Sequence, residues 1–337
     1  MFCGARAGRG DWKGELDLST GGIRTGVVGL GYFGSFHARH HAANAKSRLV
    51  GVVDADSARA DAAAATHGAQ AFSDHRDLIG RVDAVSITVP TSLHHGVAGD
   101  FLDAGVHVLI EKPIAHSPEA ARDLIARAKA SGAVLQIGHI ERFSPVFGLL
   151  KQRVVQPRHI ECVRIGPWRG RAVDVDVVLD LMIHDIDLVL SLVASPVESV
   201  DAVGSPVLSP TNDFAHAQLR FANGTTAHLS ASRVAERTER AIRLVEPDRY
   251  WTADMAERTV SSFSRTAGLD SREAFSVPPS DNLALEIDSF LDAVATTSRP
   301  LVDGKAGLDA LMVAEAILRS IAATAPAPAA LAIGGSF

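Results

Sequence analysis

Short apolar runs alternate with segments of helical spacing over the first part of the chain, up to Gly138. The runs are rich in valine and isoleucine, as is typical of strands buried on both faces of a parallel sheet, and a helical pattern separates each run from the next. This order indicates a doubly wound α/β domain. Strands are predicted at Val27-Val28 and at 49–53, 84–89, 106–110 and 134–137, and helices at 32–41, 57–67, 93–104 and 118–130.

The rhythm changes beyond Gly138, where strand patterns follow one another with no helix between each pair. Asn223-Gly224 lies between two of these patterns and is a hairpin signal, because both residues tolerate the positive φ angles of a tight turn. The second part is therefore predicted to be an α+β domain with a largely antiparallel open sheet. Its predicted strands include 160–165, 216–221 and 225–230, and its closing helices are 283–295 and 307–322.

The pattern also sets the expected domain limits. Residues 1–21 are rich in glycine and charge and lack the apolar core of a signal peptide, so we expect a disordered extension. We expect a nucleotide-binding domain over residues 22–141 and a substrate-binding and oligomerisation domain over 142–324. The Ala/Pro segment 325–337 is expected to be a frayed tail, and we find no internal repeat.

Composition argues against several classes of protein. The 337 residues are enough for two domains, and a net charge of -6 without a run of Lys or Arg argues against a nucleic-acid surface. Cys3 and Cys162 are far apart, so neither a disulfide framework nor a metal site is supported, and a reducing cytoplasm is expected. No apolar run is long enough to span a bilayer, and we expect a soluble protein.

The strongest motif is a G-x-G-x-x-G loop of Gly29, Gly31 and Gly34 between the first predicted strand and helix. Gly29 permits a tight turn, Gly31 lets a pyrophosphate approach the backbone, and Gly34 lets helix and strand pack closely. Free N–H groups at the helix start attract phosphate. Asp54 ends the next strand, where it would bind an adenosine ribose and repel a 2′-phosphate. The pattern therefore predicts that the chain binds NAD rather than NADP.

Further chemistry is expected at the strand ends, where ligands of open α/β sheets bind. Lys112 follows the predicted strand 106–110 within Glu111-Lys112-Pro113. A lysine beside a nicotinamide can stabilise the alkoxide that forms as hydride leaves. Pro113 constrains the turn, and the peptide bond before it could be cis.

A second candidate is the segment 177–190, VVLDLMIHDIDLVL, which is predicted to be one helix. Helical spacing places Asp180 and His184 one turn apart on one face, so that the carboxylate can orient the imidazole and stabilise its charged form. A general base that takes a proton from an alcohol needs this arrangement. Asp185 and Asp187 have three open roles, which are capping, pairing with arginine at the surface, or contact with a substrate hydroxyl.

Three arginines are candidates for contact with a substrate diphosphate. Arg142 follows the last strand of the first domain, and Arg169 and Arg171 lie in GPWRGR, ahead of the catalytic helix. An arginine fork suits phosphate oxygens. Arg142 is equally able to pair with Glu141 or with a carboxylate of the helix predicted at 177–190.

The histidines of the first helix are not expected to take part. His37, His40 and His41 have mixed spacing, with no carboxylate or thiol nearby to complete a metal site. We expect them to be exposed to solvent.

Five segments, in this order and spacing, together resemble the Gfo/Idh/MocA family of oxidoreductases. They are GVVGLGYFG, VPTSLHH, AGVHVLIEKP, the Asp180–His184 helix and RPLVDGKAGLDALMVAEAILRS. The resemblance covers nearly the whole chain from Ile23 and implies hydride transfer between a nicotinamide and a carbon of a sugar or polyol. Lys112 matches the lysine of the family's E-K-P motif, and Asp180 and His184 match its D-x-x-x-H pair. These three are the predicted catalytic residues, and they are also expected to bind substrate.

The resemblance also implies a set of cofactor contacts. His94 matches the histidine of the family's T-P-N-x-x-H loop, although Val89 and Thr91 replace the usual Thr and Asn. The predicted NAD-binding residues are Gly29, Gly31, Tyr32, Phe33, Gly34, Asp54, Pro90, His94, Glu111 and Lys112.

The predicted mechanism assigns one task to each catalytic residue. His184 takes the proton from the substrate hydroxyl, Asp180 holds the imidazole, and Lys112 hydrogen-bonds the developing alkoxide. Lysine and base are expected to approach from different domains.

Within the family, two segments are most similar to enzymes that oxidise the C3 hydroxyl of UDP-N-acetylglucosamine for a partner aminotransferase in lipid A biosynthesis. These segments are GHIERFSPVFGLLK and VVLDLMIHDIDLVLSLV. The alternatives are a dehydrogenase for inositol, a free sugar or UDP-N-acetylglucosaminuronate, and a dinucleotide-binding sensor or scaffold without turnover. Intact Lys112, Asp180 and His184 count against the sensor. One face of the second sheet is expected to stay free of helices and to form a homodimer or homotetramer.

Overall fold

The computed structural model describes residues 22–170, 174–266 and 268–324. The predicted extension 1–21, the tail 325–337 and Arg171 lie outside these residues. In the part of the chain that is described, no helix is both long enough and apolar enough to cross a membrane.

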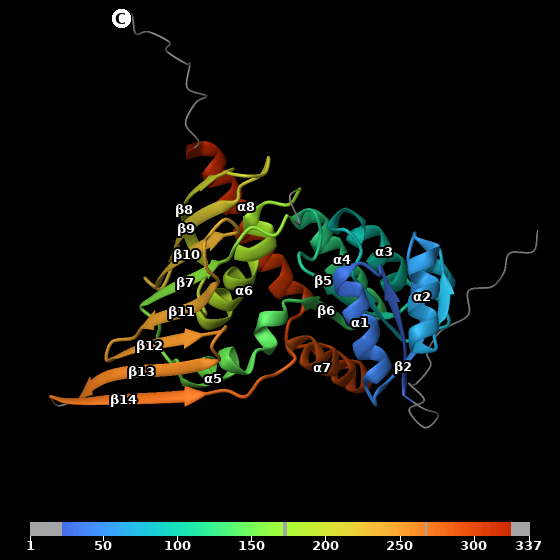
Figure 1. Cartoon of the computed structure of the whole chain (residues 1–337), viewed down its shortest axis with the longest axis horizontal. Helices are drawn as coiled ribbons and strands as arrows, with labels where there is room; N and C mark the ends of the chain where they lie inside the picture. The colour runs from blue at the N-terminus through green and yellow to red at the C-terminus, as the bar shows by residue number, and fades with distance from the viewer. Residues whose placement is uncertain (1–21, 171–173, 267, 325–337) are drawn as a thin grey trace, which may run out of the picture. The chain divides into compact units, whose positions relative to one another are not determined.

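The first half of the chain, coloured blue to green in Figure 1, forms a six-stranded sheet with the strand order β3-β2-β1-β4-β5-β6. The strand pairs from β3 through β5 are parallel, which confirms the predicted doubly wound domain. The order reverses between β1 and β4, and ligands of such sheets bind at this switch point. The elements are β1 (Ile23–Val28), α1 (Tyr32–Ala43), β2 (Ser47–Val53), α2 (Ser57–His67), β3 (Gln70–Phe72), η2 (His75–Leu78), β4 (Ala84–Ile87), α3 (Thr91–Asp103), β5 (His107–Glu111), α4 (Pro118–Ser131) and β6 (Leu135–Gly138).

The second half forms an eight-stranded sheet with the order β14-β13-β12-β11-β7-β10-β9-β8. Its pairs are antiparallel except β7 with β10, which confirms the largely antiparallel sheet. The predicted hairpin joins β9 to β10, and Gly224 has a φ of 83° in its turn. The elements are η3 (Ile140–Phe143), α5 (Pro145–Arg153), β7 (His159–Ile165), η4 (Val178–Met182), α6 (Ile183–Leu192), β8 (Val197–Ser205), β9 (Phe214–Phe221), β10 (Thr226–Ser232), β11 (Glu239–Val245), β12 (Arg249–Asp254), β13 (Thr259–Thr266), β14 (Leu269–Ser276), α7 (Asn282–Thr296) and α8 (Gly304–Thr324).

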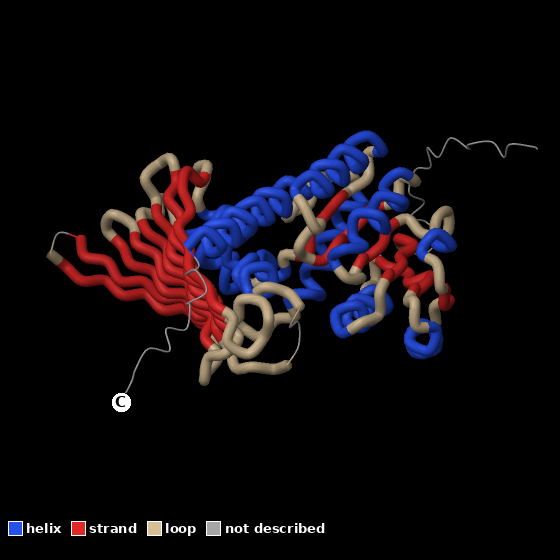
Figure 2. The backbone as a smooth tube through the Cα atoms, turned by 90° about the horizontal axis from the view of Figure 1, so that it is seen from above, coloured by secondary structure: helices blue, strands red, loops and turns tan. Residues whose placement is uncertain are grey.

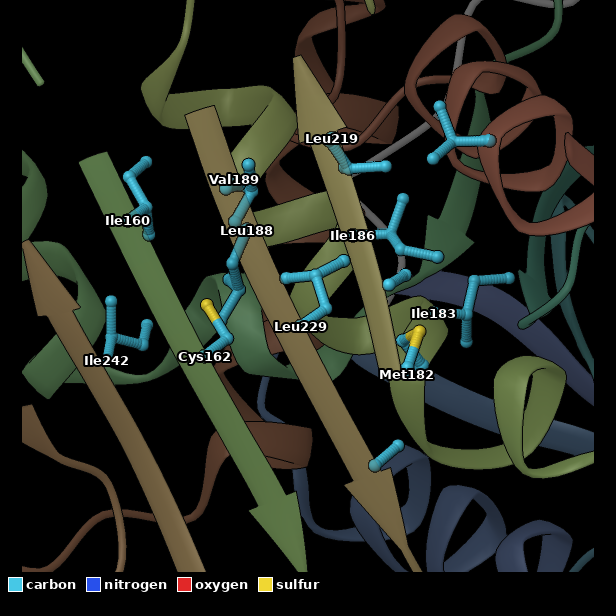
Figure 3. Close-up of a cluster of buried hydrophobic side chains, with 14 of the residues drawn as sticks. Ile160, Cys162, Met182, Ile183, Ile186, Leu188, Val189, Leu219, Leu229 and Ile242 are labelled. Atoms are coloured by element: carbon cyan, nitrogen blue, oxygen red, sulfur yellow. The ribbon is translucent and has the colours of Figure 1, made fainter. Parts of the chain in front are cut away.

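One face of the eight-stranded sheet carries the core of this half. α5, α6 and α8 contact the sheet, and Figure 2 shows these helices on one side of it. Along β9, Ala215, Ala217 and Leu219 are buried, whereas His216 and Gln218 between them are partly exposed. Burying one leucine or isoleucine stabilises the fold by roughly 1.5–3 kcal/mol. The core includes Ile160, Cys162, Met182, Ile183, Ile186, Leu188, Val189, Leu219, Leu229 and Ile242 (Figure 3).

The chain divides into two compact units. The first comprises residues up to Glu111 with Asp123–Gln136 and Ile287–Leu301, and the second comprises Lys112–Arg122, Ile137–Glu286 and the residues from Val302. Lys112 and His184 both belong to the second unit in this division. The chain leaves the first unit directly after β5, and Ile114 packs close to Gly307 of α8.

The helix predicted at 283–295, α7, is found, but it does not cover the second sheet as expected. Most of α7 belongs to the first unit. Lys46 Nζ lies 3.0 Å from Asp288 and 2.7 Å from Asp292, so ion pairs join α7 to the loop between α1 and β2. Its place beside α5 and α8 is taken by α6.

The prediction of exposed histidines on α1 is wrong for His37 and His41, which are fully buried. Both lie on the stripe of α1 that starts at Gly34 and packs against the sheet. His37 Nε2 lies 3.1 Å from Glu111 Oε1, and His41 Nε2 lies 2.8 Å from Ser86 Oγ. Burial lowers the pKa of His41 to about 3, so this ring is neutral and structural.

Candidate functional site

The glycine loop joins β1 to α1 in the first unit. Gly29 has a φ of 90°, and its N–H donates to Val53 O at 2.8 Å. A Cβ on Gly34 would lie 1.9 Å from Gly29 O, whereas a Cβ on Gly31 would meet no atom within 4 Å. The loop is therefore tight at its ends and open at Gly31, as a bound pyrophosphate requires.

The start of α1 is open to a ligand as well. Among the described residues no side chain forms a capping hydrogen bond at Gly31, and the first N–H groups of a helix have no partner within the helix itself. Tyr32 and Phe33, which are predicted cofactor contacts, are exposed at this end of the helix.

Asp54 lies at the end of β2 and is held by its own loop. Its Oδ2 accepts the N–H of Leu30 at 2.6 Å, and its Oδ1 accepts the N–H of Asp56 at 2.8 Å. Arg59 Nη2 lies 3.1 Å from Oδ1 and offsets part of the carboxylate charge. Asp54 thus ties β2 to the glycine loop, a place that suits a contact with ribose hydroxyls.

The other cofactor candidates of the first unit surround the ends of β4 and β5. Pro90 is exposed at the start of α3, and His94 is buried with its Nε2 2.9 Å from Val89 O. His94 therefore fixes the shape of the Val89-Pro90 loop. Glu111 contacts His37, as described above.

Lys112 and Asp180 lie side by side in the second unit. The Nζ of Lys112 donates to the backbone oxygen of Asp180 at 2.6 Å and lies 3.4 Å from its Oδ1. The peptide bond between Lys112 and Pro113 is cis. The ammonium group is thus held in place by Asp180.

His184 is half-buried and lies close enough to Lys112 for the lysine charge to act on its ring. Its Nδ1 has no hydrogen-bond partner, and no hydrogen bond joins it to Asp180 in the described residues. Burial and the charges of Lys112 and Arg164 hold the pKa of His184 well below its usual range. The ring is therefore neutral at physiological pH, which is the form that can accept a proton.

The segment predicted as one helix begins with a π-helical turn, η4, and continues as α6. A π turn bonds residue i to i+5, so Asp180 and His184 no longer have the offset of a regular α-helix. π turns often occur at functional sites.

Arg142 pairs with a carboxylate of α6, one of its three open roles. Its Nε lies 3.2 Å from Asp187 Oδ2, and both side chains are buried. The contact is an ion pair without the alignment of a hydrogen bond. Burial raises the pKa of Asp187 to about 7, against the opposing charge of Arg142.

Asp185 also pairs with an arginine, although in the core and not at the surface as expected. Arg164 on β7 donates to Asp185 through Nε and Nη2, and to Glu141 Oε1 through Nη1 at 2.7 Å. All three side chains are buried. An ion triad of this kind costs desolvation energy, but removing one partner costs more.

A cavity of the second unit has Asp180 on its wall. Arg169 lines it together with Trp168 and Arg240, residues that the sequence analysis did not select as a group. Arg171 lies outside the described residues. Of the three arginines proposed for a diphosphate, Arg169 is thus the one found at a cavity, and Arg142 is occupied by Asp187.

Sequence reasoning missed two further residues near Lys112. His139 is buried with no partner on either ring nitrogen, and burial with the charges of Arg142 and Lys112 lowers its pKa to about 3. Arg164 orders Glu141 and Asp185. The sequence contains a signal for the burial of Arg164, because this residue follows Ile160 and Cys162 at alternate positions of β7, which face the core.

Two family models match the chain. Residues 23–139 match the Gfo/Idh/MocA oxidoreductase family with its NAD-binding Rossmann fold, and residues 150–248 match the Gfo/Idh/MocA C-terminal domain. The chain is 41% identical over 292 residues to the UDP-N-acetylglucosamine 3-dehydrogenase of Acidithiobacillus ferrooxidans, a match that covers 85% of this chain and 93% of that enzyme. It is 29% identical over 320 residues to an inositol 2-dehydrogenase of Rhizobium meliloti, with 89% and 97% covered.

Solved structures agree with these matches. The structure of the UDP-N-acetylglucosamine 3-dehydrogenase from Acidithiobacillus ferrooxidans superposes with a TM-score of 0.85 at 40% identity, covering 90% of this chain and 98% of that one. A levoglucosan dehydrogenase in complex with NADH and levoglucosan has a TM-score of 0.81 at 19% identity, with 90% and 98% covered, which shows a shared fold.

Proposed function

The chain belongs to the Gfo/Idh/MocA family of NAD-dependent oxidoreductases, and within that family we propose that it oxidises the C3 hydroxyl of UDP-N-acetylglucosamine to the 3-keto sugar. The observation that carries this choice of substrate is the 41% identity to the Acidithiobacillus ferrooxidans enzyme over nearly its whole length. The proposal is supported by the placement of Lys112, Asp180 and His184 in one unit and by the contact of Lys112 with Asp180.

His184 is the proposed general base. Its ring is neutral and its Nδ1 is unpartnered, so it can take the hydroxyl proton of the sugar. The neighbouring ammonium group of Lys112 disfavours a lasting positive charge on the ring. The imidazolium would therefore release its proton readily after each turnover.

Lys112 is the proposed stabiliser of the alkoxide. As hydride leaves the sugar carbon, the oxygen gains negative charge until the carbonyl forms, and a fixed ammonium donor lowers the energy of that state. Asp180 is proposed to hold Lys112 by the contacts described above, so that the donor is already oriented when substrate arrives.

NAD fits the first unit, because the open space at Gly31 and the uncapped start of α1 suit a pyrophosphate and Asp54 suits a ribose. When bound, NAD supplies the hydride acceptor. The 3-keto product has a carbonyl that an aminotransferase can convert to an amine, and we place this product on a route to lipid A.

The test is an assay of NADH formation with UDP-N-acetylglucosamine, UDP-N-acetylglucosaminuronate, myo-inositol and free sugars. We expect turnover with UDP-N-acetylglucosamine, and reduction of the product with borodeuteride should place deuterium at C3, as read by NMR. Label at another carbon, or faster oxidation of myo-inositol, would contradict the proposal.

An inositol dehydrogenase is the second candidate function. The 29% identity to the Rhizobium meliloti enzyme over 89% of this chain favours it. The same panel of substrates separates the two candidate functions, because a cyclitol lacks both the diphosphate and the nucleobase of UDP-N-acetylglucosamine. Turnover with any member of the panel would also exclude a sensor or scaffold without activity.

A further inference from the structure

The cavity beside Asp180 has a lining that polyol oxidation alone does not require. Its wall includes the indole of Trp168 and the guanidinium groups of Arg169 and Arg240. Flat aromatic rings bind other flat rings, and guanidinium groups bind phosphate oxygens in pairs. The lining therefore offers two kinds of contact next to a residue of the reaction centre.

The two guanidinium groups keep most of their donors for a ligand. Arg240 Nη1 lies 3.8 Å from Glu141 Oε1, which is beyond hydrogen-bond distance, and that oxygen already accepts from Arg164. Arg169 is exposed, and within the described ranges no carboxylate forms an ion pair with it. Burial and the charges of Arg164 and Arg169 lower the pKa of Arg240, so an anion between the two arginines would relieve repulsion.

Trp168 lies beside a buried arginine, Arg233. The guanidinium carbon of Arg233 lies 5.7 Å from the centre of a Trp168 ring. Arg233 itself is buried and donates to Asp213 Oδ1 at 2.6 Å and to Val175 O at 2.8 Å. Asp213 is fully buried and also accepts three backbone N–H groups of the loop after β8. This network fixes Arg233, which offers a positive charge to the Trp168 ring.

We propose that this cavity binds the nucleoside diphosphate of the substrate, with Arg169 and Arg240 on the phosphates, Trp168 stacked on the base, and the sugar directed toward Asp180. This inference rests on the proposed function, because it concerns the same substrate. It makes Arg240 and Trp168 determinants of specificity, since a free sugar or cyclitol would leave their contacts unused.

The test measures binding of UDP and of uridine to the full chain with NAD present, by isothermal titration calorimetry. We expect UDP to bind more tightly than uridine. Arg169→Ala and Arg240→Ala should each weaken UDP binding by about tenfold or more, the value of a lost charge-assisted contact, and leave uridine binding unchanged. Trp168→Ala should weaken both ligands, and Arg240→Lys should lose less than Arg240→Ala.

Arg272→Ala is the matched control, because Arg272 is exposed on β14 and does not line the cavity. NAD affinity serves as the check of folding for every variant. Equal UDP affinity in Arg169→Ala, Arg240→Ala and the control would overturn the inference, and so would failure of UDP to bind the wild type. Oxidation of UDP-N-acetylglucosamine despite such a result would leave the proposed function standing. UDP binding that depends on Arg240, without oxidation of this sugar, would support the cavity assignment and reject the substrate.

Discussion

Replacing Gly34 by alanine tests the geometry of the nucleotide loop most directly. The added Cβ would lie 1.9 Å from Gly29 O and 2.7 Å from Thr88 Oγ1, whereas real Cβ contacts below 3.0 Å essentially do not occur. The start of α1 must therefore move by about 1.1 Å, the difference between 3.0 and 1.9 Å. Gly29 O cannot move away easily, because the Gly29 N–H donates to Val53 O and Gly29 O accepts from Thr88 Oγ1 at 2.6 Å.

Such overpacking against backbone falls at the upper end of the usual range, about 3 kcal/mol of unfolding free energy. We also expect NAD affinity to fall by at least about tenfold, since the displaced N–H groups no longer meet the pyrophosphate. Gly31→Ala should behave differently. Its Cβ meets no protein atom within 4 Å, so the fold should keep its stability, while the methyl group fills the space needed by the cofactor.

The assay combines urea unfolding with calorimetric titration of NAD. Gly96→Ala is the control, because Gly96 is exposed in α3 and an added Cβ there would meet no atom within 4 Å. Removing a glycine from a helix interior should stabilise the fold by about 0.5–1 kcal/mol without changing NAD affinity. Wild-type stability and NAD affinity in Gly34→Ala, or lost stability in Gly31→Ala, would refute the reasoning.

Four further predictions follow from the two units. His184→Asn should keep NAD binding while turnover falls by roughly two to four powers of ten, and a near wild-type rate in steady-state assays would remove His184 from the role of base. NAD should bind more tightly than NADP, and Arg59→Ala should widen the difference in affinity because Arg59 offsets the charge of Asp54. Dissociation constants for both cofactors measure the preference, and equal or tighter NADP binding would contradict it. The folded-state pKa of Asp187 is about 7 against a reference of 3.8, so its protonated form stabilises the fold fully below about pH 4, and this stability is lost as pH rises through 7. Asp187→Asn should therefore flatten the dependence of the unfolding free energy on pH across that window. An unchanged pH profile in this variant would contradict the raised pKa of Asp187. The face of the second sheet opposite α6 and α8 should mediate self-association, and a monomer mass by light scattering at micromolar concentration would count against it.

The sequence by itself determined the features that depend on neighbouring residues. Gly29 and Gly34 mark the turn from β1 to α1 because only glycine fits the positive φ at one position and the close approach at the other. Asn223-Gly224 marks a hairpin for the same kind of reason. The predicted limits of α2, 57–67, agree with the structure. α3 begins two residues before its predicted start at 93, because apolar periodicity shows that a helix exists more reliably than it shows where the helix begins.

Only the tertiary structure decided which partners the polar side chains take. Asp185 has several possible roles on a helix seen alone, and its pairing with Arg164 requires β7 to lie beside α6. His37 and His41 are buried because α1 packs this stripe against the sheet, although the residue type favours exposure. The π turn at Asp180 is equally invisible to periodicity, since one shifted backbone bond changes which side chains meet. Local backbone preferences are therefore readable from the chain, whereas contacts between distant segments depend on how those segments pack.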